Sequence, residues 1–180
     1  MSAATFFTVG HSNRAADEFL ALLNDNGIQE LVDVRKLPGS KRYPQFNADQ
    51  LADSLSKNQI GFRRYSGLTG RRPVDHNISF DTNAWWQNRS FHNYADHALS
   101  DEFSQALQAL LQTGADRVTA VMCSEAVWWR CHRRIIADYL LAREQSVMHI
   151  MGPGQSMAAT LSAGAVPQAD GTVLYPPDNN

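Results

Sequence analysis

Five short runs of apolar, β-branched and aromatic residues, separated by helix-forming segments, constrain the fold of this chain more than any other feature. The runs span residues 5–9, 31–34, 61–65, 117–122 and 147–151. Between them, apolar residues recur at helical spacing over residues 14–26, 47–57, 94–99, 101–112 and 128–144. Strands that alternate with helices pair in parallel and are covered on both faces. The sequence therefore predicts an α/β fold: a single domain with a mostly parallel open sheet of about five strands, in a Rossmann-like or flavodoxin-like layering.

Capping and turn residues refine the ends of these elements. Ser12 or Asn13 is expected to cap the first helix, and Asn47 the second. Residues 113–116 (Thr-Gly-Ala-Asp) predict a turn that ends the long helix before the fourth strand.

We expect one domain over residues 1–180, because no linker or repeat interrupts the chain. Residues 66–89 are rich in Gly, Pro, Asn and Asp and predict an irregular excursion within that domain. Residues 164–180 are rich in Ala, Gly and Pro and predict a loosely ordered tail, with one short strand at residues 172–175.

Composition excludes several classes of protein. The formal net charge of −2 and the pI of 6.3 provide no overall positive field for nucleic acid, although a local basic patch would not show in the total. Two cysteines do not make a disulfide scaffold and favour a reducing compartment. The first residues lack the pattern of a signal peptide, and no apolar run approaches the ~20 residues of a membrane span. We therefore expect a soluble, cytoplasmic protein with no membrane partner; the sequence indicates neither a cofactor nor an oligomeric state.

Polar and reactive side chains follow four of the predicted strands. They are His11, Ser12 and Arg14 after the first, Asp33 and Arg35 at the end of the second, Gly70-Arg71-Arg72 after the third, and Cys123-Ser124-Glu125 after the fourth. The carboxyl ends of parallel strands meet at one edge of the sheet, and ligands bind there. The sequence therefore predicts the functional site at this edge. If the first and fourth strands are neighbours, His11 lies near Cys123 as a general base.

The segment VMCSEAVWWRCHRR, residues 121–134, holds both cysteines. Cys123 is expected between a strand and a helix, where the positive helix end stabilises a thiolate and binds an anion. This placement is similar to that in thiol phosphatases and sulfur-transfer enzymes. However, six residues separate Cys123 from Arg130, where the phosphatase loop has five. The alternative is a small, half-buried cysteine with a packing role only.

Cys131 and His132 fall within the predicted helix 128–144, so their side chains should point about 100° apart. We therefore expect Cys131 to pack in the core while His132 or Arg133 faces the site. The seven-residue gap between the cysteines also lacks the C-x-x-C spacing of a redox couple.

An ordered set of short motifs resembles the DUF488 family. The matching pieces are residues 8–14 (TVGHSNR), 32–35 (VDVR) with Pro38 and Ser40, 65–70 (YSGLTG), 94–96 (YAD), and 123–125 with 131–133. They lie between residue 5 and about residue 150. The resemblance implies an α/β fold and assigns no activity. This chain departs from the family at Thr69, where a Gly-Leu-Gly-Gly pattern is expected, so close backbone approach at that position is in doubt.

These observations lead to one enzymatic hypothesis. The site would bind an anionic ligand, a phosphate-bearing compound such as a nucleotide or nucleic acid, and act as a Cys-dependent transferase or hydrolase. The catalytic candidates are Cys123, His11 and Glu125. The anion-binding candidates are Ser12, Arg14, Arg35, Ser124, His132 and Arg133, and Asp33 is expected to pair with Arg35 and support the site.

Three alternatives remain open. A non-catalytic, nucleic-acid-binding protein would use the basic doublets 41–42, 63–64 and 71–72, which alternate with aromatic residues. A metal enzyme would use His11, Cys123 and Glu125 with either Cys131 or His132, but the paired ligand spacing of a zinc site is absent, so no metal ligand is assigned. In the third alternative, the charged residues of the site only pair with one another and have a structural role; these are Asp33, Arg35, Glu125 and Arg133.

Overall fold

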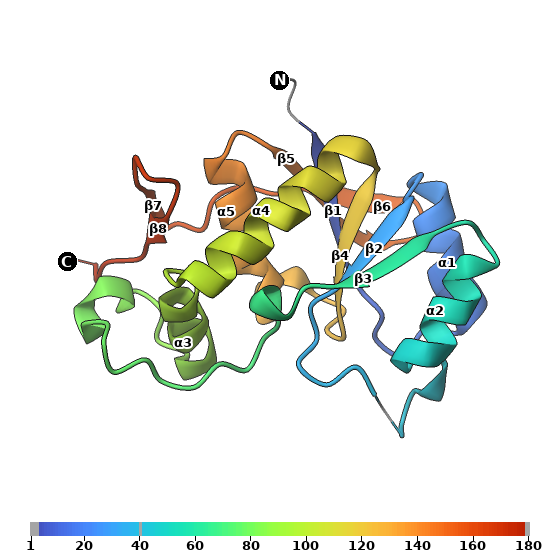
Figure 1. Cartoon of the computed structure of the whole chain (residues 1–180), viewed down its shortest axis with the longest axis horizontal. Helices are drawn as coiled ribbons and strands as arrows, with labels where there is room; N and C mark the ends of the chain where they lie inside the picture. Colours follow the sequence, from blue (N-terminus) through green and yellow to red (C-terminus); the bar gives the residue numbers. More distant parts are fainter. Residues whose placement is uncertain (1–3, 40, 179–180) are drawn as a thin grey trace.

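Six strands form one sheet in the order β3-β2-β4-β1-β5-β6 in the computed structural model, which describes residues 4–39 and 41–178 (Figure 1). The strands are β1 (Thr5–Gly10), β2 (Glu30–Asp33), β3 (Gly61–Arg64), β4 (Thr119–Cys123), β5 (Ser146–Gly152) and β6 (Gln155–Ala158). The first five are parallel, and β6 returns antiparallel to β5. The predicted α/β class with a mostly parallel sheet is therefore confirmed. Ser40 of the family resemblance and residues 179–180 of the tail lie outside the described residues.

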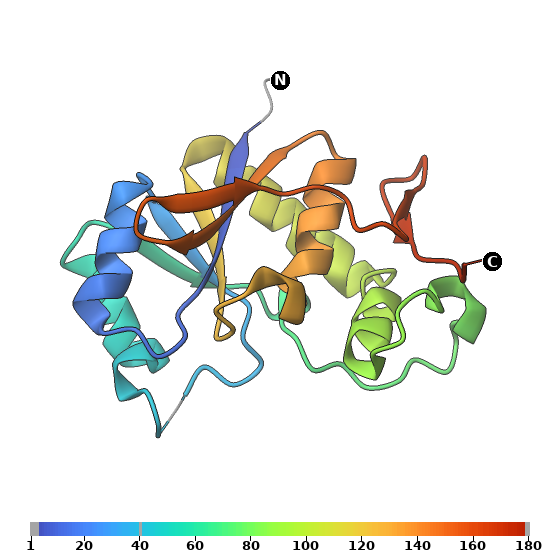
Figure 2. The same cartoon turned by 180° about the vertical axis from the view of Figure 1, so that it is seen from behind.

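Helices cover both faces of this sheet (Figures 1 and 2). They are α1 (Ala16–Asp25), α2 (Ala48–Ser56), α3 (Arg89–His97), α4 (Asp101–Asp116) and α5 (Arg133–Ala142). Side chains of α1 and α2 share a core with Ala120 and Met122 of β4, whereas those of α3, α4 and α5 share the other core with Val121 and Cys123. Successive side chains of a strand point to opposite faces. Cys123 therefore ends β4 on the face that α5 covers.

The predicted start of the first helix is wrong. The first helix begins at Ala16 with Ala15 as its N-cap, and neither Ser12 nor Asn13 caps it. Instead, the two residues after β1 extend the backbone pairing of β1 with β4. The backbone N–H of His11 donates to Cys123 O at 2.9 Å, and that of Ser12 donates to Ser124 O at 3.0 Å.

The predicted turn at residues 113–116 is the last turn of α4. A Cβ added at Gly114 would lie 2.1 Å from Cζ of Phe6, so this glycine permits close packing of α4 on β1. The glycine marks a helix–strand contact rather than a helix stop.

Part of the segment predicted as a loose tail packs against the domain. Strands β7 (Val166–Pro167) and β8 (Val173–Leu174) pair as a short hairpin, and β8 falls within the strand expected at residues 172–175. Tyr175 is 0% exposed and donates its hydroxyl to Asp138 Oδ2 of α5 at 2.8 Å. Its backbone N–H donates to Asn83 Oδ1 at 3.1 Å, and this ties the tail to the excursion.

The excursion of residues 66–89 contains two short 3-10 turns, Ser66–Leu68 and Phe80–Asn83. Trp85 and Trp86 pack into the body of the protein. Trp86 stacks on Phe91 at 4.9 Å, and the guanidinium of Arg134 lies 4.9 Å from the centre of the Trp86 ring. Within residues 4–39 and 41–178, no helix has the length and apolar character needed to cross a bilayer.

Tyr175 provides a test of the role of the tail. We expect Tyr175→Ala to lower the free energy of unfolding by about 3–5 kcal/mol, as for other large buried aromatics. Tyr175→Phe removes only the hydroxyl and should cost about 1–3 kcal/mol, because a buried acceptor loses its donor. Urea unfolding measures both. Val166→Ala, in the exposed part of the same hairpin, should stay within about 0.5 kcal/mol of wild type; equal effects at the two positions would contradict this account.

Candidate functional site

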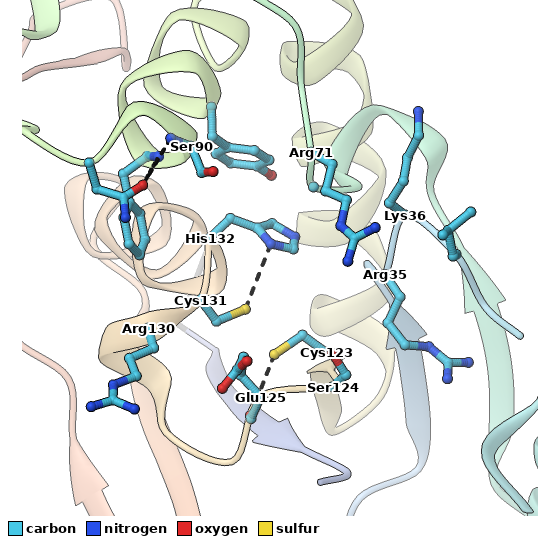
Figure 3. A pocket seen from close by; sticks show the side chains of 15 residues that line it. Arg35, Lys36, Arg71, Ser90, Cys123, Ser124, Glu125, Arg130, Cys131 and His132 are labelled. Carbon is cyan, nitrogen blue, oxygen red and sulfur yellow. Dashed lines mark hydrogen bonds between the residues drawn. The ribbon is translucent and has the colours of Figure 1, made fainter. Parts of the chain in front are cut away.

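A cavity of about 320 Å³ lies at the carboxyl ends of β2 and β4 (Figure 3). The connection that leaves β2 leads to its neighbour β3, whereas the connection that leaves β4 crosses β1 to reach β5. The two connections diverge, which is the arrangement that opens a binding crevice in a parallel sheet. The residues that line the cavity include Arg35, Lys36, Gly70, Arg71, Phe91, Tyr94, Cys123, Ser124, Glu125, Arg130, Cys131 and His132.

The two cysteines meet in this cavity, with their sulfur atoms turned toward one another (Figure 3). Cys123 ends β4, and Cys131 follows a 3-10 turn at Trp128–Arg130. The predicted helix 128–144 is wrong at its start: Cys131 is extended, with φ −132° and ψ 147°, and α5 begins only at Arg133. The helical angle between Cys131 and His132 therefore does not apply. Cys131 is buried, as expected, but it also lines the site beside His132.

His132 is oriented by the backbone of β2. Its Nε2 lies 3.0 Å from Val34 O, so Nε2 carries the proton and Nδ1 is left as an acceptor. Nδ1 lies 3.7 Å from the sulfur of Cys131. Burial lowers the pKa of His132 to about 4, so the imidazole is neutral at neutral pH. This geometry gives Cys131 a neutral base with a fixed tautomer.

Gly70 makes room for that imidazole. A Cβ added at Gly70 would lie 2.7 Å from Cε1 of His132. The preceding Thr69, where the sequence departs from the family pattern, is buried and bonds its own turn by donating from Oγ1 to Ser66 O at 2.8 Å. The close backbone approach in this segment occurs at Gly70.

Arg133 lies buried beneath the two thiols. It is 0% exposed and forms no ion pair with a carboxylate in the part of the chain that the structure describes. One guanidinium nitrogen, Nη2, donates to Ala126 O at 3.2 Å, whereas Nε and Nη1 are buried without an acceptor among the described residues. A buried, unpaired cation is costly, and it favours an anion beside it.

The anion that suits Arg133 is a thiolate. Burial by itself would raise the pKa of the Cys123 thiol, but its interaction with the Cys131 thiol, the Arg133 charge and a backbone hydrogen bond at Glu125 together lower it. The pKa of Cys131 is raised well above its usual value by burial and by the neighbouring Cys123. The pair therefore carries its first negative charge on Cys123, while Cys131 keeps its proton.

Three cationic residues line the cavity, and the charged ends of two of them, Lys36 and Arg130, point away from the two sulfurs (Figure 3). Lys36, Arg71 and Arg130 line it, and none of the three side chains forms a hydrogen bond or ion pair with a described residue. Glu125 is the carboxylate among the lining residues. The excess of positive charge favours an anionic ligand.

Arg35 also reaches the cavity, but its guanidinium is already paired. Nε and Nη2 donate to Asp33 Oδ1 and Oδ2 at 2.9 Å each, and Nη1 donates to Phe46 O at 2.7 Å. The head of Arg35 points away from the two sulfurs (Figure 3). The expected Asp33–Arg35 pair is present, and it leaves Arg35 little capacity to hold a phosphate.

Strands β1 and β4 are neighbours, with Gly10 opposite Cys123, yet the side chain of His11 does not line the cavity. Its ring stacks on Phe46 at 4.4 Å, in the core beneath α1 and α2, on the face of the sheet opposite to Cys123. Nδ1 donates to Ser12 O at 2.9 Å, so Nε2 accepts from Arg35 Nη1 at 3.3 Å. His11 thus supports the Asp33–Arg35 pair.

The other predicted anion ligands are divided. Ser124 and His132 line the cavity, whereas Ser12, Arg14 and Arg133 do not. Arg14 donates instead to Gly10 O and Met151 O, at 3.4 and 3.1 Å. Among residues 4–39 and 41–178, no group of three His, Cys, Asp or Glu side chains is placed to hold a metal ion.

Several lining residues were given no role at the site from the sequence, among them Lys36, Arg130 and Cys131. The sheet-edge rule placed Arg71 at this edge without a role, and it could have included Lys36, which follows β2. The basic doublets separate in the structure: Arg63 pairs with Glu30 at 2.7 Å and Arg72 with Glu102 at 3.6 Å, whereas Arg71 alone lines the cavity.

A family model, described as domain of unknown function DUF488, matches residues 15–140, which is more than half of the chain. The chain belongs to the DUF488 family. The resemblance seen in the sequence is therefore confirmed. The matched region of this DUF488 protein includes both cysteines and His132, whereas the residues 11–14 that follow β1 lie outside it. No curated protein and no solved structure matches the chain.

Buried histidines make the stability depend on pH. Burial lowers the pKa of His132 and of His149, each from 6.5 to about 4, and the Arg133 charge adds to the effect. Between these pH values the unfolded chain binds more protons than the folded protein. We therefore expect the free energy of unfolding to fall as the pH is lowered from about 6.5 to about 4.

His149 provides the variant for this test. It stacks on Trp128 at 4.6 Å and bonds Thr8 Oγ1 at 2.6 Å. In urea unfolding across this pH range, the free energy of unfolding should fall less steeply in His149→Gln than in wild type. In His76→Gln, at an exposed position, it should fall with the wild-type slope. An equal slope in all three proteins would show that buried His149 does not cause the dependence.

Proposed function

We propose that the cavity binds a small anionic ligand and that Cys123 acts on it as a nucleophile. The observation that carries the proposal is a thiol of lowered pKa in a cavity lined by three cations, Lys36, Arg71 and Arg130, whose side chains form no ion pair with a described residue. A thiolate is the reactive form of cysteine, and the cations would hold the anionic part of the ligand beside it. A phosphate-bearing compound such as a nucleotide suits this charge, and a transferase or hydrolase suits a thiolate nucleophile.

Other groups would assist the reaction from fixed positions. Glu125 lies at the cavity with its carboxylate exposed and would exchange protons with the ligand or with water. Ser124 would donate a hydrogen bond to the bound anion. His11, bonded to Ser12 and Arg35, would act as a positioning residue.

A nucleic-acid-binding role has less support. It would need a continuous basic surface, whereas Arg63 and Arg72 are engaged with carboxylates and Arg71 lines the cavity instead.

Both cysteines are free thiols, which suits a reducing, cytoplasmic setting.

Alkylation of the thiols tests the proposal. We expect iodoacetamide to modify Cys123 with a pH midpoint below the ~8.5 of a free cysteine, and Cys131 to stay unmodified at neutral pH. Peptide mass analysis distinguishes the two sites. A midpoint at the value of a free cysteine would remove the basis for a nucleophilic Cys123.

The anion preference is measured in the same assay. In wild type, the rate of Cys123 alkylation by anionic iodoacetate, relative to that by neutral iodoacetamide, should be higher than for a free thiol. Inorganic phosphate should slow the reaction with iodoacetate. Both effects should weaken in Arg71→Gln, whereas Lys57→Gln, which removes an exposed cation at the end of α2, should leave them unchanged. Equal effects in the two variants would mean that net charge, not the cavity, governs reactivity.

A further inference from the structure

The proposed nucleophile has a second thiol directly beside it. The sulfurs of Cys123 and Cys131 face one another in one cavity, and both thiols are free (Figure 3). We propose that they form a dithiol–disulfide exchange centre that reduces anionic low-molecular-weight disulfides, with Cys123 as the attacking thiol and Cys131 as the resolving thiol. This inference rests on the proposed function, because it needs a nucleophilic Cys123 in an anion-binding cavity. It adds the reaction and the class of substrate.

The fold brings the two thiols together although the C-x-x-C spacing of a redox couple is absent. Residues 124–130 leave the end of β4 and return through the 3-10 turn, so a seven-residue gap closes on itself. Each cysteine is held at the end of a regular element. Cys123 is paired in the sheet opposite Gly10, and the sulfur of Cys131 accepts a hydrogen bond at 3.4 Å from the backbone N–H of Arg133, the first residue of α5.

Contacts of Cys131 suit a resolving thiol. Nδ1 of His132, at 3.7 Å, accepts a hydrogen bond from the Cys131 thiol and orients it, and the Arg133 N–H and the start of α5 stabilise the thiolate that forms. Two of the influences that raise the pKa of Cys131, after burial, come from Cys123 itself. Once Cys123 is bonded to a substrate sulfur, these influences end while the Arg133 charge remains. The resolving thiol is therefore activated by the first step.

The reaction balances in two exchanges. The Cys123 thiolate attacks one sulfur of a disulfide RS–SR, which forms Cys123–S–SR and releases RS⁻. The released RS⁻ takes up the proton of Cys131, and the Cys131 thiolate attacks the Cys123 sulfur, which forms the Cys123–Cys131 disulfide and releases the second RS⁻. The substrate gains two electrons and the protein loses two, and a small dithiol reductant restores the free thiols.

Charge defines the class of substrate and the reduction potential of the thiol pair. The cations of Lys36, Arg71 and Arg130 would hold carboxylate or phosphate groups of the disulfide, while Phe91 and Tyr94 line the cavity with aromatic surface. Formation of the internal disulfide removes the thiolate beside buried Arg133, and this raises the reduction potential of the pair. Net reduction of the substrate therefore requires excess disulfide, and the internal disulfide is in turn readily reduced by the dithiol reductant.

The test exposes the reduced wild-type protein to oxidised glutathione, which is anionic, and in parallel to neutral 2-hydroxyethyl disulfide and cationic cystamine, with acid quenching and intact-mass analysis. We expect the internal disulfide, seen as loss of two hydrogens without an adduct, to form fastest with oxidised glutathione. Arg71→Gln should reduce this preference over the neutral reagent, and Lys57→Gln should not.

Variants of the two thiols separate the steps. Cys131→Ser and Cys131→Ala should both stop at a mixed disulfide with one glutathionyl group on Cys123, and Cys123→Ser should form neither product. A wild-type protein that accumulates the mixed disulfide as stably as Cys131→Ser would overturn the inference while leaving a nucleophilic Cys123 intact. A Cys123 that forms no adduct and resists alkylation would instead overturn the proposed function.

Discussion

A buried guanidinium without a carboxylate partner is the constraint on which the site depends. Arg133 is enclosed at the start of α5, and two of its nitrogens donate to no described residue. The loss of hydration around such a cation is offset only by nearby negative charge or dipoles. The groups available are the thiols of Cys123 and Cys131. Burial, and to a lesser extent the same charge, lowers the pKa of His132 and of His149, so the surrounding imidazoles stay neutral and do not compete for the anion.

The rest of the fold holds the partners of this charge in place. Alternation along β4 directs Cys123 toward α5, and the turn before α5 brings Cys131 back to it. The carbonyl of Val34 fixes the tautomer of His132. Asp33 and Arg35 neutralise each other next to this cavity, so Lys36, Arg71 and Arg130 are the cations that would attract a ligand. In the proposed mechanism, one internal cation stabilises the thiolate, and separate external cations bind the substrate.

The sequence predicts the layers of the fold and the edge that carries the site. Buried parallel strands are continuous apolar runs, and their alternation with helices determines the class; the sequence alone therefore places Cys123 and Arg35 at one edge. Strand β6 was missed because all its residues are exposed and show no apolar alternation. The packing of the tail was not predicted because buried Tyr175 contacts Asp138, a residue far along the chain.

The errors at the site have a similar origin. The roles of Cys131 and His132 depend on a break before α5 that helical periodicity does not reveal, because Trp128 and Trp129 suit a helix as well as a turn. For His11, the pairing of β1 with β4 does not by itself place the side chain near Cys123. A side chain one position beyond the strand can turn to either face, and His11 turned to Phe46.

The most direct test of the account is a pH titration of thiolate ultraviolet absorbance in the reduced protein, with wild type and Arg133→Met compared. Replacement of a buried charge by an apolar side chain of similar size should preserve the fold. We predict that wild type gains one thiolate below the ~8.5 of a free cysteine and that this step moves above that value in Arg133→Met. The same low midpoint in both proteins would contradict the claim that Arg133 holds the charge of the thiol pair.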